Sequence, residues 1–427
     1  VAALHYVAHK LDRIVVLDRS GSMGGGTGKF EAARSAGLLL VDELAGSDQG
    51  GYVAFHHDAA LRVALAPMNA GQRTALENSI QAEAAGGNTS IGDGLLTAAT
   101  EEDAHGSEKN GCAFALLTDG YENDPAYWDD VKADVLDNGC AIDAVAFGPE
   151  ANEDLLYEIA AAQPSTKGSF AYAPRSGNVP VLTAAGDKQL AWGNNLARLF
   201  DASAARGAAR QRIASFVGSG ATTEQQSFVV DASATELVIA IAWPQPLVSP
   251  FIQPMTPANV AVPVAFRFKS PQGTHQIWRI PNPQPGTWKL LNFIPNQQSY
   301  VGVSAVTKVS MHLFVDSPQT SPLQGLRVPL KVAMVQNGQP GLGATVTARA
   351  TAPDGVQKTL LLHDDGDHRD GDPGDGVYGN VYSRTPVGEV VVDDPHGAKE
   401  GKAPASVGSY RVEAVGLLAG QRREDEG

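Results

Sequence analysis

Short apolar runs alternate with longer amphipathic runs from Arg13 to Ala173. The apolar runs at 14–17 and 113–117 are continuous, which is typical of strands covered on both faces. Strands that alternate with helices in this way form a parallel sheet with helices packed on its two sides. The sequence therefore predicts a doubly wound α/β domain with a mostly parallel sheet over residues 1–200.

The individual elements of this domain follow from the same periodicity. Strands are predicted at 13–17, 51–56, 112–118, 141–147 and 169–172, with a short antiparallel strand at 61–65. Helices are predicted at 29–44, 70–83, 91–102, 126–136, 153–162 and 188–199.

The pattern changes near residue 200, because 20 of the 26 prolines lie beyond it and long helices become implausible there. Short β-type runs separated by Pro, Gly and Asn turns predict two all-β sandwich domains, the second of them Ig-like. A helix is predicted at 204–216, within a connector between the α/β domain and the first sandwich. The predicted boundaries are 201–222 for the helical connector, 223–320 and 321–418 for the sandwiches, and 419–427 for a mobile tail, which has nothing apolar to bury from Gln421 onward.

Composition and charge exclude several classes of protein. The chain has 32 Lys and Arg against 47 Asp and Glu, a formal net charge of −15, so a strongly basic nucleic-acid binder is not expected. No apolar run approaches the roughly 18 residues of a membrane-spanning helix, so no transmembrane segment is expected.

The chain has two cysteines, Cys112 and Cys140, which are too few for a disulfide scaffold or a four-cysteine zinc site. They begin two strands that we place as neighbours in the sheet, so a disulfide between them is geometrically conceivable. Buried free thiols are the favoured expectation, because a disulfide requires Cα atoms within about 7 Å in the right orientation.

Oxygen-bearing side chains lie at three junctions between a strand or loop and a helix. Asp18, Ser20 and Ser22 follow the first strand, Thr89 precedes a helix, and Asp119 follows a later strand. In a parallel α/β sheet such junctions meet at the carboxyl edge, where ligands bind. Hydroxyls and carboxylates without His or Cys suit Mg²⁺ or Mn²⁺ rather than zinc. Neutral hydroxyls leave the ion with residual positive charge, which favours an incoming carboxylate from a partner.

These segments resemble the von Willebrand factor A domain with a complete metal-ion-dependent adhesion site. The resemblance is carried by Asp-x-Ser-x-Ser at 18–22, Thr-x-Ile-Gly-x-Gly-Leu at 89–95 and Thr-Asp-Gly at 118–120, and covers roughly residues 10–200. It implies that the two serines bind the ion directly and that the threonine does so in the ligand-occupied form. It also implies that the two aspartates act directly or through water.

The whole layout also resembles the second half of the calcium-activated chloride channel regulator family and its bacterial relatives. The shared features are Gly-Thr-Trp-Lys-Leu at 286–290 and the Asp-Gly loop at 364–378. The zinc-protease segment of those regulators has no counterpart here, because no His-Glu-x-x-His occurs in the sequence. We therefore expect none of the proteolytic activity that such a segment carries.

The loop at 364–378 holds six aspartates, whose like charges repel one another unless a cation or solvent relieves them. One interpretation is a Ca²⁺ site, although Arg369 and the missing final Glu do not fit an EF-hand. The other is a solvated turn in which the side chains bond to their own backbone. The aspartates concerned are Asp364, Asp365, Asp367, Asp370, Asp372 and Asp375.

Together these features predict a Mg²⁺-dependent protein-binding module of the adhesion type, secreted or exposed at the cell surface. Its expected partner is a protein that presents an Asp or Glu carboxylate, and no catalytic residue is assigned. The extracellular location rests on the appended sandwiches and is an architectural analogy. Three alternatives stay open. They are an intracellular A domain that docks onto an ATPase or chelatase, a hydrolase that uses the ion as a Lewis acid, and a structural scaffold without metal.

Overall fold

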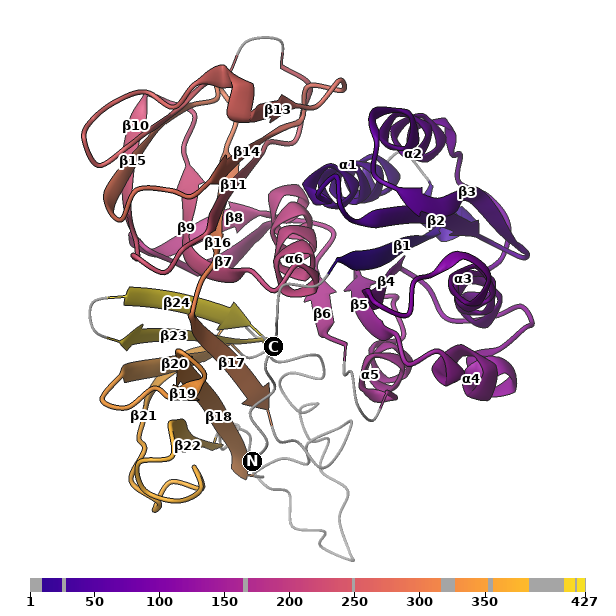
Figure 1. Ribbon diagram of the computed structural model, residues 1–427. Helices are drawn as coiled ribbons and strands as arrows, with labels where there is room; N and C mark the ends of the chain where they lie inside the picture. The colour runs from indigo at the N-terminus through magenta and orange to yellow at the C-terminus, as the bar shows by residue number, and fades with distance from the viewer. Residues whose placement is uncertain are drawn as a thin grey trace, which may run out of the picture. The chain divides into compact units, whose positions relative to one another are not determined.

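The computed structural model describes residues 10–24, 28–163, 168–247, 250–315, 327–351, 356–383, 411–418 and 421–426. The chain divides into two units, Val1–Lys308 and Val309–Gly427 (Figure 1). Among the helices described, none is both long and apolar enough to cross a membrane.

A six-stranded sheet forms the centre of the α/β domain, with the order β3-β2-β1-β4-β5-β6. All neighbouring strands are parallel except β2 and β3, which are antiparallel. This confirms the predicted fold class, including the short antiparallel strand. The strands are β1 (Leu11–Asp18), β2 (Gln49–Phe55), β3 (Ala59–Pro67), β4 (Gly111–Thr118), β5 (Ala141–Phe147) and β6 (Phe170–Ala173).

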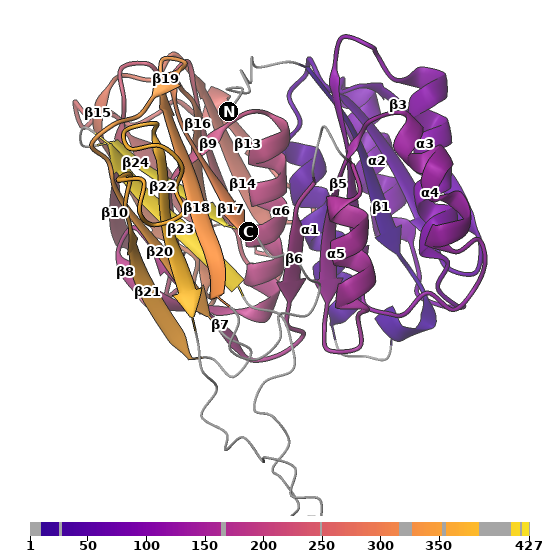
Figure 2. The same ribbon diagram turned by 90° about the horizontal axis from the view of Figure 1, so that it is seen from below.

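Helices cover both faces of this sheet, with α1 and α6 on one side and α3 and α4 on the other (Figure 2). Alternate residues of β1 serve the two cores, since Val15 and Leu17 pack with α1 and α6 while Ile14 and Val16 pack with α3 and α4. The helices are α1 (Lys29–Glu43), α2 (Ala70–Ala82), α3 (Ile91–His105), α4 (Trp128–Asp137), α5 (Glu153–Ala161) and α6 (Trp192–Gly207).

The last helix of the domain lies elsewhere than the sequence predicted. Residues 178–183 and 186–191 form an antiparallel hairpin of β7 (Asn178–Thr183) and β8 (Gly186–Ala191), so the predicted helix at 188–199 begins only at Trp192. Gly186, with φ of 90°, provides the left-handed residue after the hairpin turn. The predicted connecting helix at 204–216 is wrong beyond Gly207, because Ala209 has φ of 51° and β9 (Gln211–Gly218) follows it.

Two antiparallel sheets follow the α/β domain within the first unit. One has the order β13-β14-β11-β16-β9 and the other β10-β15-β12. Trp243, Trp278 and Trp288 are buried in the core that these strands build. The strands are β10 (Glu224–Val230), β11 (Glu236–Ala242), β12 (Phe251–Met255), β13 (Arg267–Lys269), β14 (His275–Pro281), β15 (Gly286–Phe293) and β16 (Ser299–Val306), with a short 3-10 turn η2 (Val264–Phe266).

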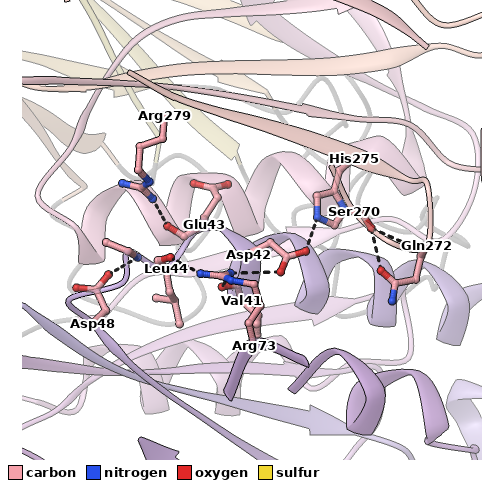
Figure 3. Close-up of polar contacts among 11 residues, drawn as sticks. Val41, Asp42, Glu43, Leu44, Asp48, Arg73, Ser270, Gln272, His275 and Arg279 are labelled. Carbon is pink, nitrogen blue, oxygen red and sulfur yellow. Dashed lines mark hydrogen bonds and ion pairs between the residues drawn. The ribbon is translucent and has the colours of Figure 1, made fainter. Parts of the chain in front are cut away.

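Polar side chains join α1 to β14 (Figure 3). Buried Asp42 of α1 bonds through Oδ2 to Nε2 of buried His275, 2.8 Å away. Arg73 of α2 holds the other carboxylate oxygen of Asp42 at 3.3 Å, and Arg279 donates to the Glu43 carbonyl at 2.5 Å. The first sandwich is therefore tied to the end of α1 by hydrogen bonds that the sequence did not predict. In Figure 1, α6 lies between α1 and the strands β9 and β16.

The described residues of the second unit form antiparallel β strands around one core. In one sheet β18 pairs with β17, β19 and β22, and a further run of strands has the order β24-β23-β20-β21. The strands are β17 (Val309–Val315), β18 (Arg327–Gln336), β19 (Gln339–Pro340), β20 (Thr345–Thr351), β21 (Gln357–Leu362), β22 (Val377–Ser383), β23 (Arg411–Leu418) and β24 (Gln421–Glu426).

The prediction of a mobile tail at 419–427 is wrong for 421–426, while 419, 420 and 427 lie outside the described residues. Strand β24 pairs with β23 along its whole length. Arg423 is buried, and its Nε donates to the Val309 carbonyl at 2.9 Å. Backbone pairing and this hydrogen bond order a segment that lacks apolar residues.

Cys112 and Cys140 form a disulfide, so the expectation of free thiols is wrong. Their Cα atoms are 4.8 Å apart because β4 and β5 are parallel neighbours in a register that pairs Ala113 with Ala141. The bridge fastens the amino-terminal ends of the two strands, opposite the edge that carries Asp119.

Glu102 of α3 lies beside this disulfide, with a carboxylate oxygen and the two sulfurs within 4.8 Å of one another. The side chain is buried, and its Oε2 has no hydrogen-bond partner among the described residues. Burial, together with the nearby charge of Asp12, raises the pKa of Glu102 to about 7. The folded state therefore binds a proton that the unfolded state releases near pH 4.5.

This pKa shift predicts a pH-dependent loss of stability. The stabilising contribution of protonated Glu102 is complete below pH 4.5 and is lost as the pH rises through 7. We expect Glu102→Gln to remove about 2 kcal/mol of the decline in unfolding free energy between pH 5 and pH 8. Urea unfolding at both pH values measures this, with exposed Glu108→Gln as the control. An unchanged pH dependence in Glu102→Gln would contradict the prediction.

Candidate metal centre

The sheet topology brings the first and last of the three predicted segments together. Strands β1 and β4 are adjacent and parallel, so Asp18 at the end of β1 and Asp119 just after β4 lie at the same edge. Both side chains are completely buried. Beyond Asp18 the chain turns through a short 3-10 segment, η1 (Gly21–Met23), which carries Ser22.

A continuous series of hydrogen bonds connects four of the predicted residues. The backbone N–H of Ser20 donates to Asp18 Oδ1 at 2.6 Å, and the Ser20 and Ser22 hydroxyl oxygens are 2.9 Å apart. The Ser22 hydroxyl donates to Asp119 Oδ1 at 2.6 Å. The Asp-x-Ser-x-Ser segment and the residue after β4 therefore form one polar cluster.

Thr89 completes the cluster from the loop that precedes α3. A Cβ atom added to Gly120 would lie 3.3 Å from Thr89 Oγ1 and 3.5 Å from Ser22 Oγ, so the two hydroxyls flank this glycine. Asn123 fixes Thr89 by accepting its N–H at 2.8 Å and by donating its own N–H to the Thr89 carbonyl at 2.9 Å. The structure thus brings all five predicted side chains to one place.

This donor set fits a hard divalent cation. Two carboxylates and three hydroxyls supply only oxygen ligands, which Mg²⁺ and Mn²⁺ prefer and which are a poor match for zinc. The absence of a side chain at Gly120 keeps the Thr89 and Ser22 hydroxyls clear of steric contact. Ser22 is exposed whereas Ser20 and Thr89 are buried, so the cluster reaches solvent on the Ser22 side.

The buried carboxylates interact electrostatically. Burial raises the pKa of Asp18 to about 6, and the charge of Asp119 adds to this effect. Hydrogen bonds from the Thr118 hydroxyl, 2.5 Å from Asp18 Oδ2, and from the Ser20 N–H oppose the increase. The cluster therefore favours any positive charge that is brought to it.

Lys29, the first residue of α1, already brings one positive charge to the cluster. Its ammonium forms an ion pair with Asp119 Oδ2, and both side chains are buried. From the sequence, Lys29 is predicted only as the first residue of a helix. A signal was available, however, because a cation in the first turn of a helix is disfavoured by the helix dipole and therefore needs another partner.

Three further acidic side chains shape the loops around the cluster. Glu122 accepts the N–H groups of Gly92 at 2.7 Å and Trp128 at 2.9 Å, which fixes the start of α3 to that of α4. Asp124 accepts from the Asn88 amide at 2.7 Å, and Asp93 accepts the N–H of Ala59. These carboxylates hold the loops together, a role that their sequence positions alone do not reveal.

Residues 12–184 match the family model of the von Willebrand factor type A domain. The chain contains a von Willebrand factor type A domain. The match spans β1 to β7 and includes every residue of the polar cluster. Residues 330–393 match a second model, the second Ig-like domain of conditioned medium factor.

Curated proteins similar to the chain include a chloride channel regulator and a cyanobacterial protein. Calcium-activated chloride channel regulator 1 of Equus caballus is 27% identical over 385 residues, which are 86% of this chain and 39% of that protein. An uncharacterised protein of Synechocystis is 33% identical over 165 residues, which are 38% of this chain and 37% of that protein. The chain thus spans less than two fifths of the length of these relatives.

Among solved structures, a von Willebrand factor type A protein from Catenulispora acidiphila is similar to the chain with a TM-score of 0.40. The two are 15% identical, and the similarity covers 77% of this chain and 63% of that one.

The predicted calcium loop lies between β21 and β22 in the second unit. Asp364 accepts the Gly374 N–H at 2.8 Å, and Asp370 accepts the N–H groups of Asp365 at 2.7 Å and Gly366 at 2.9 Å. Asp365 also pairs with His368 at 2.9 Å. The loop is a turn whose carboxylates bond to their own backbone. The calcium site at Asp364, Asp365, Asp367, Asp370, Asp372 and Asp375 stays a prediction.

Proposed function

We propose that the A domain is a divalent-metal-dependent protein-binding module of the adhesion type. The observation that supports this is the convergence of three hydroxyls and two buried carboxylates, from three separate loops, at the carboxyl edge of the sheet. When bound, Mg²⁺ or Mn²⁺ would supply the residual positive charge that attracts a partner's carboxylate. The ion would be held by Asp18, Ser20, Ser22, Thr89 and Asp119.

The five side chains have different roles in holding the ion and in exposing it to a partner. Asp18 and Asp119 supply negative charge at the buried side, and their hydrogen bonds to the Ser20 N–H and the Ser22 hydroxyl orient both loops. Exposed Ser22 marks the side from which a partner reaches the cluster. The expected ligand is an Asp or Glu side chain on another protein, and we assign no reaction to the site.

We place the protein outside the cell or at its surface. The support is the disulfide between Cys112 and Cys140, because such bonds persist in oxidising compartments and are rare in the cytosol. This observation favours the adhesion module over an intracellular partner of an ATPase or chelatase. Detection of Cys112 and Cys140 as free thiols in the denatured protein, with no reductant added, would argue against the extracellular location.

Metal binding tests the site directly. We expect Ser22→Ala to weaken Mg²⁺ binding, measured by calorimetry on the intact chain, by about tenfold to a hundredfold. The reason is that Ser22 offers a ligand oxygen and orients Asp119 at the same time. Ser107→Ala, in the loop after α3, is the matched control and should bind like the wild type. Equal Mg²⁺ affinity in Ser22→Ala and wild type would refute the assignment.

Partner binding tests the function. Proteins captured by the intact chain in Mg²⁺ should be released by a chelator, and the Ser22→Ala variant should not capture them. Blocking the carboxylates of a captured partner should abolish binding even with Mg²⁺ present. Capture that survives both the chelator and Ser22→Ala would show that another surface of the protein is responsible.

A further inference from the structure

We propose that the Lys29 ammonium is a permanent positive charge within the metal centre. Because of this charge, tight binding of the divalent ion depends on the partner's carboxylate. This inference rests on the proposed function, since it concerns how that same site is regulated. It follows from the position of the Lys29 ammonium, which pairs with Asp119 in the interior of the cluster.

The geometry leaves Lys29 little freedom to act as a solvated surface charge. The side chain is 3% exposed and its partner Asp119 is completely buried. The preceding Gly28 has φ of 74°, a left-handed conformation suited to glycine, and the chain enters α1 immediately after it. Lys29 therefore stands at the start of α1, with its ammonium on the same carboxylate to which the Ser22 hydroxyl donates.

The charges in the cluster then determine what the site accepts. Asp18 and Asp119 contribute two negative charges and Lys29 contributes one positive charge, which leaves a single net negative charge. A divalent cation alone would turn this into a single net positive charge. A divalent cation together with one carboxylate would leave the cluster neutral.

Neutrality matters because these groups are buried, and an uncompensated buried charge is strongly unfavourable. The ion alone should therefore bind weakly, and the ion together with a carboxylate should bind much more strongly. By linkage, each must raise the affinity for the other by the same factor. Without Lys29 the ion alone would neutralise the two aspartates, and a partner's carboxylate would add an excess negative charge.

The test is Mg²⁺ calorimetry on the intact chain, with acetate as the carboxylate probe and sodium chloride at equal ionic strength as its control. In the wild type we expect acetate to tighten Mg²⁺ binding by about tenfold or more. In Lys29→Met we expect Mg²⁺ binding without acetate to tighten by about tenfold or more, and the effect of acetate to disappear. Lys29→Arg keeps the charge and should retain the acetate effect.

The variants also separate this role from a purely structural one. If Lys29 only held Asp119 in place, Lys29→Met would weaken Mg²⁺ binding or leave it unchanged, and either result overturns the inference. Lys29→Gln provides a second neutral variant if Lys29→Met does not fold, and exposed Lys109→Met is the control. Absence of Mg²⁺ binding to the wild type, with or without acetate, would instead refute the proposed metal site itself.

Discussion

Replacement of Asp143 by Ala is expected to lower the free energy of unfolding by about 3 to 5 kcal/mol. Asp143 lies on β5, and its Oδ2 is 2.9 Å from Arg13 of β1, whose side chain is 1% exposed. The Asp143 carboxylate also bonds to the Ser169 hydroxyl at 2.7 Å and lies 3.6 Å from Arg206 of α6. Its removal leaves the Arg13 guanidinium buried without its partner, at the point where α6 is fastened to the sheet.

The stability difference between wild type and Asp143→Ala should also depend on pH, because Asp143 titrates. Burial tends to raise the pKa of Asp143, but the charges of Arg206 and Arg13, together with hydroxyl donors, hold it well below its ordinary value. The stabilising contribution is therefore present above the unfolded pKa of 3.8 and is lost as the pH falls below it. The difference in stability between wild type and Asp143→Ala should be constant from pH 5 to 8 and should shrink in acid.

Urea unfolding of the wild type, Asp143→Ala and the exposed control Asp137→Ala measures both effects. The control should stay within about 0.5 kcal/mol of the wild type. A loss below about 1 kcal/mol in Asp143→Ala would mean that Arg13 is solvated or finds another acceptor. In that case the Arg13–Asp143 ion pair would not be what holds α6 against the sheet.

Local periodicity was enough to predict β1 to β6 and α1 to α5 of the A domain, but not the β7–β8 hairpin or the start of α6. Continuous apolar runs such as 14–17 are typical of strands covered on both faces, and β1 is indeed buried along its whole length. The order of strands and helices then placed the ends of β1 and β4 at one edge. The clustering of Asp18 and Asp119 needed no further information than this topology.

Features that depend on distant partners were not predicted. The order of β24 depends on pairing with β23, which composition does not report. The contact between Asp42 and His275 joins residues 233 positions apart, and neither position carries a local signal of the other. The helix dipole indicates that Lys29 needs a further partner, but nothing local identifies that partner as Asp119, which lies 90 positions away.

The second large effect is expected at Gly120, which follows Asp119 at the end of β4. Gly120→Val should weaken Mg²⁺ binding by roughly a hundredfold and leave the fold intact. The added Cβ would lie 3.3 Å from Thr89 Oγ1 and 3.5 Å from Ser22 Oγ, and the two methyl groups of valine would occupy the space between these hydroxyls. Gly120→Ala adds only the Cβ atom, so its effect should be a few-fold.

Gly111→Val is the matched control, because it makes the same change at the other end of β4, where an added Cβ meets nothing within 4 Å. Calorimetry with Mg²⁺ and urea unfolding should be run on all three variants. The expected order of Mg²⁺ affinity is wild type and Gly111→Val, then Gly120→Ala, then Gly120→Val. Gly120→Val should stay folded with a loss of about 1 to 3 kcal/mol in unfolding free energy. Wild-type affinity in a folded Gly120→Val protein would mean that the ion is not held between Thr89 and Ser22, and the proposed ligand set would have to be abandoned even if the protein binds metal elsewhere.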